Sequence, residues 1–412
     1  MITVASHPDA VQCDRILVVC TRYVGDTLLA IPFLRNLRRA HPQAVIDVCA
    51  EGGARAVLEH CPYIDERISW TRRPRERSGG VAAGLSAIAS QAAWLRSRSY
   101  TRAYLLKPSL SAAALARLAG IPQRIGFAGE SSPLLTRRVR RQRGRHQVET
   151  YLDLLRADGV AIDDGRNENW VPPAAARHVT SLIARLPAGR PRVFLAPRST
   201  DYLKHWPVDR WQRLIRWMVD DRGCEIVLCG GPADAMAHGK LLTAVGPEIA
   251  AHMHDWSADV PLSDAAALAA QMDLCIGVDT GLIHLAASVK VPVVVLVGPT
   301  DPNRWSPWQT RSFVLRSGHV QSSLTEQLLT ACGAAAHLRW PLGRALVDDI
   351  AYDDVATTVA GLLPPSALKT LDFTRGSFRY EVTVRSAAPG DVAAGTMVVP
   401  EHDPREAPAT TP

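Results

Sequence analysis

The chain has 412 residues, which exceeds the usual size of one domain and predicts two. Its hydrophobic fraction of 47% is typical of a globular protein, and apolar runs such as VPVVVLVG at 291–298 are far shorter than the roughly 20 residues of a membrane-spanning helix, which excludes an integral membrane protein. The first fifteen residues lack the basic start and apolar core of a secretory signal, so we expect a cytoplasmic protein.

The net charge of +7 is unevenly distributed along the chain. Residues 1–175 hold 25 Lys and Arg against 16 Asp and Glu, whereas the remaining residues hold 22 against 24. The arginine clusters TRRPRER at 71–77 and RRVRRQRGR at 137–145 could bind nucleic acid, an anionic membrane surface or an acidic substrate. A solvated arginine-rich loop is an equally good interpretation of the first cluster.

Short β-branched runs alternate with helix-like stretches through the first half of the chain. This alternation predicts parallel strands joined by crossover helices in a doubly wound sheet. The predicted strands are RILVVC (15–20), AVIDVC (44–49), RAYLLK (102–107) and RIGF (124–127), and the first predicted helix runs from Asp26 to Ala40. Pro32 should remove one backbone hydrogen bond from that helix and kink it.

VGDTLLAIP at 24–32 follows the first predicted strand and places Asp26 where a helix begins. Asp is a common residue at helix N-caps, so the carboxylate could serve only to cap the helix. If instead it faces a cleft, it could act as a general base. The stretch alone leaves both interpretations open.

A polar, proline-containing segment, DDGRNENWVPP at 163–173, predicts a linker after the first domain. A second series of strands follows, at VFLAP (193–197), EIVLCGG (225–231), LCIGVD (274–279) and VPVVVLVGP (291–299). We therefore predict two Rossmann-like domains, residues 1–172 and 173–364. The remaining residues, 365–412, form an extension that is partly disordered by composition, and we assign it no function.

APRSTDYLKHWPVDRW at 196–211 follows the first strand of the second domain. One loop there contains Arg198, Ser199, Thr200 and Lys204. Cations and hydroxyls gathered beyond a strand end are suited to a diphosphate. Lys204 on its own would be an ordinary surface lysine.

GVDTGLIHLAA at 277–287 joins a buried strand to a helix. Ligands of open parallel sheets bind at the carboxyl ends of strands, where helix N-termini attract anions. Here Gly281 would let a ligand approach the backbone, Thr280 offers a hydroxyl and an N–H, and Asp279 can accept hydrogen bonds from sugar hydroxyls. The simpler interpretation of this stretch alone is that Asp279 or Thr280 caps the helix.

Other common site patterns are missing from the sequence. It contains no G-x-G-x-x-G after either first strand, no G-x-x-x-x-G-K-[ST], no G-x-S-x-G and no H-E-x-x-H, so dehydrogenase, P-loop and hydrolase functions lose their main support. The eight cysteines form no C-x-x-C pair, and several stand in apolar runs. We expect buried reduced thiols rather than disulfides or a metal cluster.

Together, VGDTLLAIP, RSTDYLKHWP and GVDTGLIHLAA followed by GPTDP resemble glycosyltransferase family 9, the ADP-heptose lipopolysaccharide heptosyltransferases. The motifs occur in order from about residue 15 to about residue 363, and V-D-T-G with T-D-x-x-K-H-W-P is closest to the heptosyltransferase I branch. The resemblance implies a GT-B fold, in which two Rossmann-like domains face each other across a cleft. It implies that the N-terminal domain holds the acceptor and the C-terminal domain the nucleotide sugar.

The resemblance also implies an inverting transfer of heptose from ADP-heptose, with no bound metal or cofactor. Asp26 matches the base, Lys204 a phosphate-binding lysine that stabilises the departing ADP, and Asp279 a contact to heptose hydroxyls. Thr280 and Gly281 match contacts to the diphosphate. For His284, a core or capping role and a ligand contact both stay open.

The implied acceptor is an anionic glycolipid, the Kdo region of lipid A, so we expect an enzyme peripheral to the cytoplasmic face of the inner membrane, without a nucleic-acid partner. The candidate acceptor contacts are Arg22, Arg137, Arg138, Arg140 and Arg141, the last four in a predicted loop. The extension and the segment 71–77 match no family pattern, which leaves the acceptor open. Alternatives are transfer of another sugar, transfer to a protein, and a noncatalytic nucleotide-sugar- or lipid-binding protein in which Asp26 is only a cap. Nucleic-acid binding would rest on the arginine clusters alone.

Overall fold

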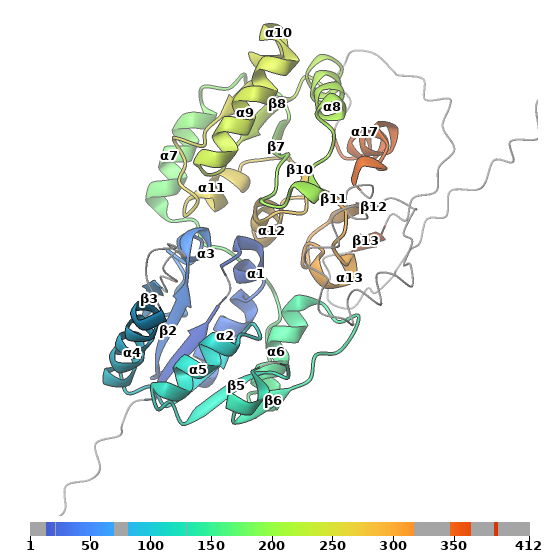
Figure 1. The fold of residues 1–412 in the computed structure, drawn as a ribbon. Coiled ribbons are helices and arrows are strands. Elements are labelled where there is room, and N and C mark those ends of the chain that lie inside the picture. The colour runs from blue at the N-terminus through green and yellow to red at the C-terminus, as the bar shows by residue number, and fades with distance from the viewer. Residues whose placement is uncertain are drawn as a thin grey trace, which may run out of the picture. The chain divides into compact units, whose positions relative to one another are not determined.

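The computed structural model describes residues 14–20, 22–69, 81–129, 131–316, 347–363 and 383–385. The chain divides into two compact units, Met1–Glu168 and Asn169–Pro412. Each unit contains a largely parallel sheet with helices on its faces (Figure 1). The first arginine cluster, 71–77, and all of the extension except 383–385 lie outside the described residues.

The first unit contains a six-stranded parallel sheet with the strand order β3-β2-β1-β4-β5-β6. The strands are β1 (Arg15–Val19), β2 (Val45–Ala50), β3 (Glu66–Ser69), β4 (Arg102–Leu105), β5 (Gln123–Phe127) and β6 (Arg137–Val139). The helices are α1 (Val24–Leu28), α2 (Ile31–Ala40), α3 (Gly52–Ala56), α4 (Val81–Ser97), α5 (Leu110–Leu118), η1 (Ser132–Leu134) and α6 (Gln147–Ala157). The order reverses between β1 and β4, which makes the gap between their carboxyl ends the expected binding crevice of a doubly wound sheet.

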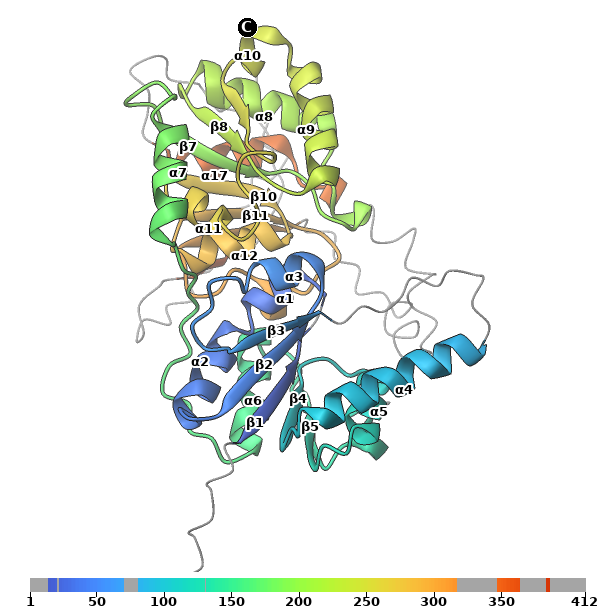
Figure 2. The same ribbon diagram turned by 90° about the vertical axis from the view of Figure 1, so that its left-hand side faces the viewer.

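Helices cover both faces of this sheet, which explains why its central strands are apolar without alternation. Leu105 packs in one core cluster with residues of α4 and α5, which lie side by side (Figure 2). Tyr104 points to the other face, where its ring meets Phe33 of α2 edge-on at 5.2 Å. Its hydroxyl donates to Asp158, the residue that ends α6.

Two features of the first unit differ from the sequence prediction. The expected helix from Asp26 to Ala40 is two helices, α1 and α2, and Pro32 is at the start of α2. The predicted kink is therefore wrong: a proline in the first turn needs no N–H partner, so the chain starts a new helix there. The strands β3 and β6 were not predicted, because ERIS and RRV are short, charged and at the two edges of the sheet.

The second unit contains a seven-stranded sheet with the order β13-β12-β11-β10-β7-β8-β9, in which only β13 is antiparallel to its neighbour. The strands are β7 (Arg192–Ala196), β8 (Glu225–Leu228), β9 (Met253–Asp255), β10 (Leu274–Val278), β11 (Val293–Val297), β12 (Ser312–Arg316) and β13 (Thr383–Arg385). The helices are α7 (Pro173–Ile183), η2 (Tyr202–Lys204), α8 (Val208–Asp220), α9 (Pro232–Val245), α10 (Pro247–Ala250), α11 (Ala265–Ala269), α12 (Gly281–Ser288), α13 (Pro302–Trp305) and α17 (Tyr352–Ala360). The order reverses between β7 and β10.

Glycine sets the distance between β7 and β10 at this reversal. Gly277 of β10 pairs with Ala196 of β7, and a Cβ atom on Gly277 would lie 2.3 Å from the Ala196 carbonyl oxygen. No side chain fits there without moving one strand. The carboxyl ends of the two strands are therefore held close together.

Candidate functional site

Two loops that follow β7 and β10 meet at the reversal point of the second sheet. Because the strands are parallel neighbours, both loops leave the sheet at the same edge. Lys204, at the end of the first loop, donates a 2.7 Å hydrogen bond from Nζ to Oδ2 of Asp279, which directly follows β10. The pair joins positions 75 residues apart and brings two of the predicted site segments together.

Asp279 is a charged group in a buried position, with 9% of its side chain exposed. Burial by itself would raise the pKa of Asp279, but His284 and the ammonium of Lys204 more than offset this and hold the pKa well below its ordinary value. The group is therefore a carboxylate at any working pH. A carboxylate can only accept hydrogen bonds, which suits it to bind hydroxyl groups.

The capping interpretation of Asp279 does not hold. The N-cap residue of α12 is Thr280, one position later, and its side chain makes no capping hydrogen bond. The first N–H groups of α12 consequently have no side-chain cap, beside the ammonium of Lys204. This arrangement favours an anion at the helix N-terminus.

His284 is buried in α12 and faces the same carboxylate. Its Nε2 lies 3.8 Å from Oδ1 of Asp279, which is an ion-pair distance rather than a hydrogen bond. Its Nδ1 is buried and has no hydrogen-bond partner among the described residues. His284 is thus not a cap, and a direct contact with a ligand stays a prediction.

Local hydrogen bonds fix the loop that carries Lys204. Asp201 caps η2, because its Oδ1 accepts a hydrogen bond from the N–H of Leu203 at 3.1 Å. His205 donates to the carbonyl oxygen of Ser199 at 2.7 Å, and Trp206 donates from its indole to the carbonyl oxygen of Ile350 at 2.9 Å. Sequence reasoning missed the roles of Asp201 and His205, although an Asp two residues before a backbone donor is a common turn signal.

The other predicted members of this loop are placed less specifically. Arg198 and Ser199 are half-buried and Thr200 is exposed. The Ser199 hydroxyl accepts a hydrogen bond from the N–H of Asp201 at 3.4 Å, which stabilises the turn. All three residues lie between the carboxyl end of β7 and Lys204, so they share an edge of the sheet with Asp279.

Asp26 lies at the carboxyl ends of the strands of the first sheet, just after β1. The N-cap residue of α1 is Tyr23, and Asp26 is inside the first turn, so it is not the cap that the sequence allowed. Its side chain is half-buried near Cys20, whose pKa is raised to about 12, first by burial and then by Cys61 and Asp26. The carboxylate is therefore at the carboxyl edge beside the β1–β4 reversal, where ligands of such sheets bind.

A comparison with known families identifies the kind of protein that carries these residues. The family model described as Glycosyltransferase family 9 (heptosyltransferase) matches residues 88–331, more than half of the chain. The chain belongs to glycosyltransferase family 9. It is an enzyme that transfers a glycosyl group, and the resemblance drawn from its motifs is confirmed.

Known relatives of this family 9 enzyme match most of its length. Lipopolysaccharide heptosyltransferase 2 of Escherichia coli K12 is 29% identical over 312 residues, which are 73% of this chain and 88% of the relative. Lipopolysaccharide heptosyltransferase 1 of the same strain is 28% identical over 320 residues, 74% of this chain and 93% of the relative. Because these identities are nearly equal, they do not separate the branches, and closeness to heptosyltransferase I stays a prediction.

Solved structures show the same fold class. The structure of the E. coli ADP-heptose LPS heptosyltransferase II has a TM-score of 0.63 and 27% identity, covering 73% of this chain and 90% of that chain. A family 9 glycosyl transferase from Veillonella parvula has a TM-score of 0.67 at 21% identity, covering 85% and 97%. The predicted α/β GT-B class, with two Rossmann-like units, is confirmed.

The arginines that were predicted to contact the acceptor fall into two groups: some lie in strand β6 and the others lie in loops that follow strands. Arg137 and Arg138 belong to strand β6, so the predicted loop is wrong at these positions: three residues of the arginine run pair with β5. Arg137 is at the amino end of β6, whereas Asp26 follows the carboxyl end of β1, so the two residues lie at opposite ends of the parallel strands. Arg140 and Arg141 follow the carboxyl end, and the Arg141 guanidinium lies 4.9 Å from the centre of the Phe127 ring.

Arg22 follows β1 at the same edge as Asp26. Its guanidinium lies 5.1 Å from the ring centre of Tyr23 and donates to the Tyr23 hydroxyl at 3.0 Å. The Nζ of Lys107, which follows β4, lies 5.4 Å from the same ring centre. Arg22 and Lys107 therefore both lie at the reversal point of the first sheet of this glycosyltransferase, and the sequence prediction named only Arg22.

The described residues include free cysteines but no cluster suited to a metal ion. In that part of the chain, no group of three or more His, Cys, Asp and Glu side chains is placed to hold a metal ion. The described cysteines at 20, 49, 61, 224, 229 and 275 are free thiols. No helix in the described ranges has both the length and the apolar character needed to cross a bilayer.

Proposed function

We propose that this enzyme transfers heptose from ADP-heptose to an anionic acceptor, the Kdo region of a lipid A core, with inversion at the anomeric carbon. The observation that carries the proposal is the Lys204–Asp279 pair beside the uncapped N-terminus of α12. The relatives named as lipopolysaccharide heptosyltransferases, including one named for ADP-heptose, support this choice of donor and acceptor.

The donor diphosphate would lie between the ammonium of Lys204 and the first N–H groups of α12, at Thr280 and Gly281. Both groups attract anions, and a hydrogen bond to a charged oxygen is stronger than one to a neutral oxygen. Hydroxyls of Ser199 and Thr200 and the guanidinium of Arg198 are available in the same loop for the remaining phosphate oxygens. Charge grows on the diphosphate as ADP departs, so these donors stabilise the transition state more than the bound donor.

Asp279 would accept hydrogen bonds from heptose hydroxyls. Its depressed pKa keeps it ionised in the buried site, and its bond to Lys204 fixes its position before the sugar arrives. His284 lies beside Oδ1, the carboxylate oxygen that Lys204 does not contact, and further limits the orientations of the Asp279 side chain. A fixed acceptor of hydrogen bonds favours a polyhydroxylated sugar at this point.

Asp26 would act as the general base. The acceptor hydroxyl attacks the anomeric carbon on the face opposite the diphosphate, the new C–O bond forms as the bond to the phosphate oxygen breaks, and ADP leaves with the electron pair. The hydroxyl proton passes to the Asp26 carboxylate. Attack from the opposite face inverts the configuration.

The acceptor would be held by cations at the carboxyl edge of the first sheet. Arg22, Arg140 and Arg141 are the proposed contacts, and Lys107 joins them because it shares the Tyr23 ring with Arg22. Arg137 and Arg138 are not included, because they lie in β6. A lipid-linked acceptor would place the enzyme at the cytoplasmic face of the inner membrane, as a peripheral protein.

The test is a transfer assay with purified protein. ADP release is followed with ADP-heptose and a panel of other nucleotide sugars, each paired with Kdo-bearing lipid A, with its heptosylated form and with a protein acceptor. We expect release only with the ADP-heptose and Kdo-bearing lipid A pair, and a product whose anomeric signal in NMR is inverted. Release with the heptosylated acceptor alone would assign the enzyme to another branch. No release with any heptose donor would overturn the proposal.

A further inference from the structure

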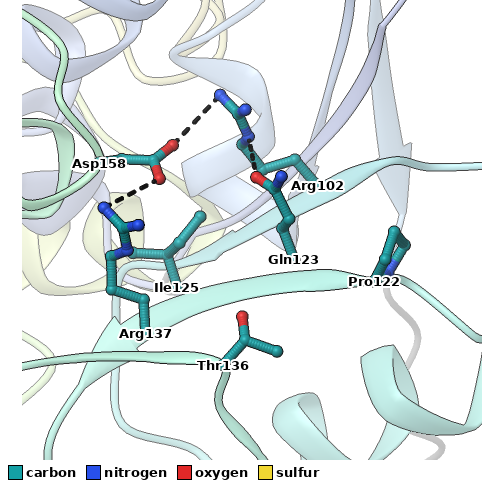
Figure 3. Close-up of a pocket in the computed structure, with 7 residues that line it drawn as sticks. All are labelled: Arg102, Pro122, Gln123, Ile125, Thr136, Arg137 and Asp158. Carbon is teal, nitrogen blue, oxygen red and sulfur yellow. Dashed lines mark hydrogen bonds and ion pairs between the residues drawn. The ribbon is translucent and has the colours of Figure 1, made fainter.

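A polar cavity of about 280 Å³ opens at the amino ends of β4, β5 and β6 (Figure 3). It is lined by Arg102, Pro122, Gln123, Ile125, Thr136, Arg137 and Asp158. Asp26 and the acceptor contacts proposed above, Arg22, Lys107, Arg140 and Arg141, follow the carboxyl ends of strands in the same sheet. The cavity is therefore separate from the site proposed for heptosyl transfer.

Strand register brings the lining residues to one face of the sheet. Arg102 pairs with Gln123, and Ile125 pairs with Arg137. Paired residues of parallel strands project to the same face, and so do residues two apart in one strand. Asp158, at the end of α6, lies over that face and completes the wall.

Arg102 is held in one orientation. Its Nε donates to Oε1 of Gln123 at 2.8 Å, and its Nη1 lies 3.1 Å from Asp158 and 3.0 Å from Nε2 of His41. Burial, and then the charge of Arg102, lower the pKa of His41, so the neutral ring accepts this hydrogen bond. With its oxygen engaged by Arg102, Gln123 has its amide nitrogen left to donate.

Arg137 is less constrained, with 51% of its side chain exposed. Its Nη1 donates to the carbonyl oxygen of Ala157 and lies 3.5 Å from Oδ1 of Asp158. Among the residues that the structure describes, Nε and Nη2 of Arg137 and the amide nitrogen of Gln123 form no side-chain hydrogen bond. Figure 3 shows both guanidinium groups directed toward the one carboxylate of Asp158.

We propose that this cavity binds a phosphate group, either free phosphate or the phosphate of a lipid headgroup. Two guanidinium groups and one carboxylate give the lining a net positive charge, and the donors that remain are neutral or cationic. Guanidinium groups match the geometry of phosphate oxygens in bidentate contacts. The volume is just below the usual range of about 300–1,000 Å³ for organic ligands, which suits a small anion better than a nucleotide sugar.

The alternative is a closed ion-pair network in which Asp158 only ties β4 and β6 to the end of α6. In such a network, every hydrogen-bond donor of the arginines would have an acceptor within the protein. Here one carboxylate serves two arginines and the hydroxyl of Tyr104, and several donors are left without partners beside open space. An additional anion would satisfy them.

Neighbouring arginines of β6 provide the test. Arg137→Gln and Arg138→Gln remove the same charge from adjacent positions, but successive residues of a strand project to opposite faces, so only Arg137 lines the cavity. Sodium phosphate is titrated into the full-length protein by calorimetry. We expect saturable binding that Arg137→Gln weakens about 10-fold or more, the scale of one lost charge-assisted hydrogen bond, and that Arg138→Gln leaves unchanged. Gln123→Ala, which keeps the charge, should also weaken it.

Two further experiments distinguish this cavity from the proposed diphosphate site at α12, and free phosphate from the phosphate of a lipid headgroup. The titrations are repeated with Lys204→Ala, which should remove only phosphate bound at α12. Flotation with phosphatidylglycerol vesicles, against phosphatidylcholine vesicles, tests a headgroup: a loss of binding specific to Arg137→Gln in this assay assigns the site to lipid phosphate. Equal losses in Arg137→Gln and Arg138→Gln, or no saturable binding to either probe, would overturn the proposal.

Discussion

Asp279 depends on Lys204, because the ammonium of Lys204 compensates a carboxylate that is nearly buried. Asp279 is nearly buried, and its carboxylate is compensated by an ammonium that itself is 21% exposed. A carboxylate left in such a place without its cation would keep its desolvation cost and lose its partner. Changes to either member of the pair should therefore affect both stability and ligand binding.

Lys204→Ala should weaken the binding of ADP and of the intact donor alike, because both have the diphosphate. It should also lower the free energy of unfolding by about 1–3 kcal/mol, since it leaves Asp279 with less compensation. Calorimetry with ADP and urea denaturation measure the two effects. Lys240→Ala, a change at an exposed lysine of α9, is the control and should do neither. Unchanged ADP affinity in Lys204→Ala would remove this lysine from the site.

Asp26→Asn should lower kcat by about 100-fold or more, the usual scale for loss of a general base. Because Asp26 is not the N-cap of α1, we expect little change in the melting temperature. Because the proposed donor site is in the other unit, ADP affinity should stay the same. Steady-state assays and thermal denaturation check this. Normal turnover in the variant would show that the base is another group.

The close approach of β7 to β10 determines where the loops that carry Lys204 and Asp279 leave the second sheet. Gly277→Ala would place a Cβ atom 2.3 Å from the Ala196 carbonyl, so the strands must separate. We expect a loss of about 1–3 kcal/mol in stability, as in other overpacked cores, together with weaker ADP binding. The matched control is Gly239→Ala in α9, where the new methyl group meets nothing within 4 Å. It should stabilise the protein by up to about 1 kcal/mol. Similar effects of the two changes would argue against this role of Gly277.

Helix α2 is tied to the segment that follows α6 by a pH-dependent contact. Asp164 bonds to Arg166 and is paired with the buried Arg35 at 3.2 Å. The bonds to Arg166, opposed by burial and reinforced by Arg35, lower the pKa of Asp164 from 3.8 to about 2. A carboxylate whose pKa is lower in the folded protein stabilises the fold at any pH above its pKa in the unfolded chain. This contribution is lost as the pH falls through the pKa of the folded state.

The stability of the wild type should therefore exceed that of Asp164→Asn by a constant amount at neutral pH, and the difference should shrink between pH 3.8 and about 2. Urea denaturation at a series of pH values measures it. Asp163→Asn changes a neighbouring, exposed carboxylate and should leave the pH profile nearly unaltered. A difference that persists at the lowest pH would contradict the assignment.

At the scale of the whole molecule, the surplus of positive charge in the first 175 residues is the feature that a membrane-bound acceptor would meet. Each Lys or Arg near an anionic surface contributes about 1 kcal/mol, and the attraction fades over a Debye length of about 8 Å at physiological salt. We expect Arg140→Gln with Arg141→Gln to raise KM for the lipid acceptor without changing KM for the donor. The comparison is Arg138→Gln, a change in β6 outside both the cavity and the proposed acceptor contacts, which should leave acceptor KM unchanged. An acceptor KM that survives the double change at low salt would place the acceptor elsewhere.

Much of this molecule could be predicted from its sequence, because strands buried on both faces are apolar runs and the strand–loop–helix junctions have distinctive residues. The junction at Asp279 was recognised for that reason. The edge strands β3 and β6 were missed, because charged residues conceal their pairing. The hydrogen bond between Lys204 and Asp279 could not be predicted from the sequence either. A contact between residues 75 positions apart depends on the order of the strands and not on a local sequence pattern.

The composition of those two edge strands has a consequence for how copies of the chain behave toward each other. A sheet edge presents unpaired N–H and C=O groups, onto which a strand of another molecule can add. In the first sheet, β3 contains Glu66 and Arg67, and β6 contains Arg137 and Arg138. Joining either edge to a second molecule would bring these charges into a continuous sheet and remove water from them. The arginine run thus also protects the enzyme from edge-to-edge aggregation.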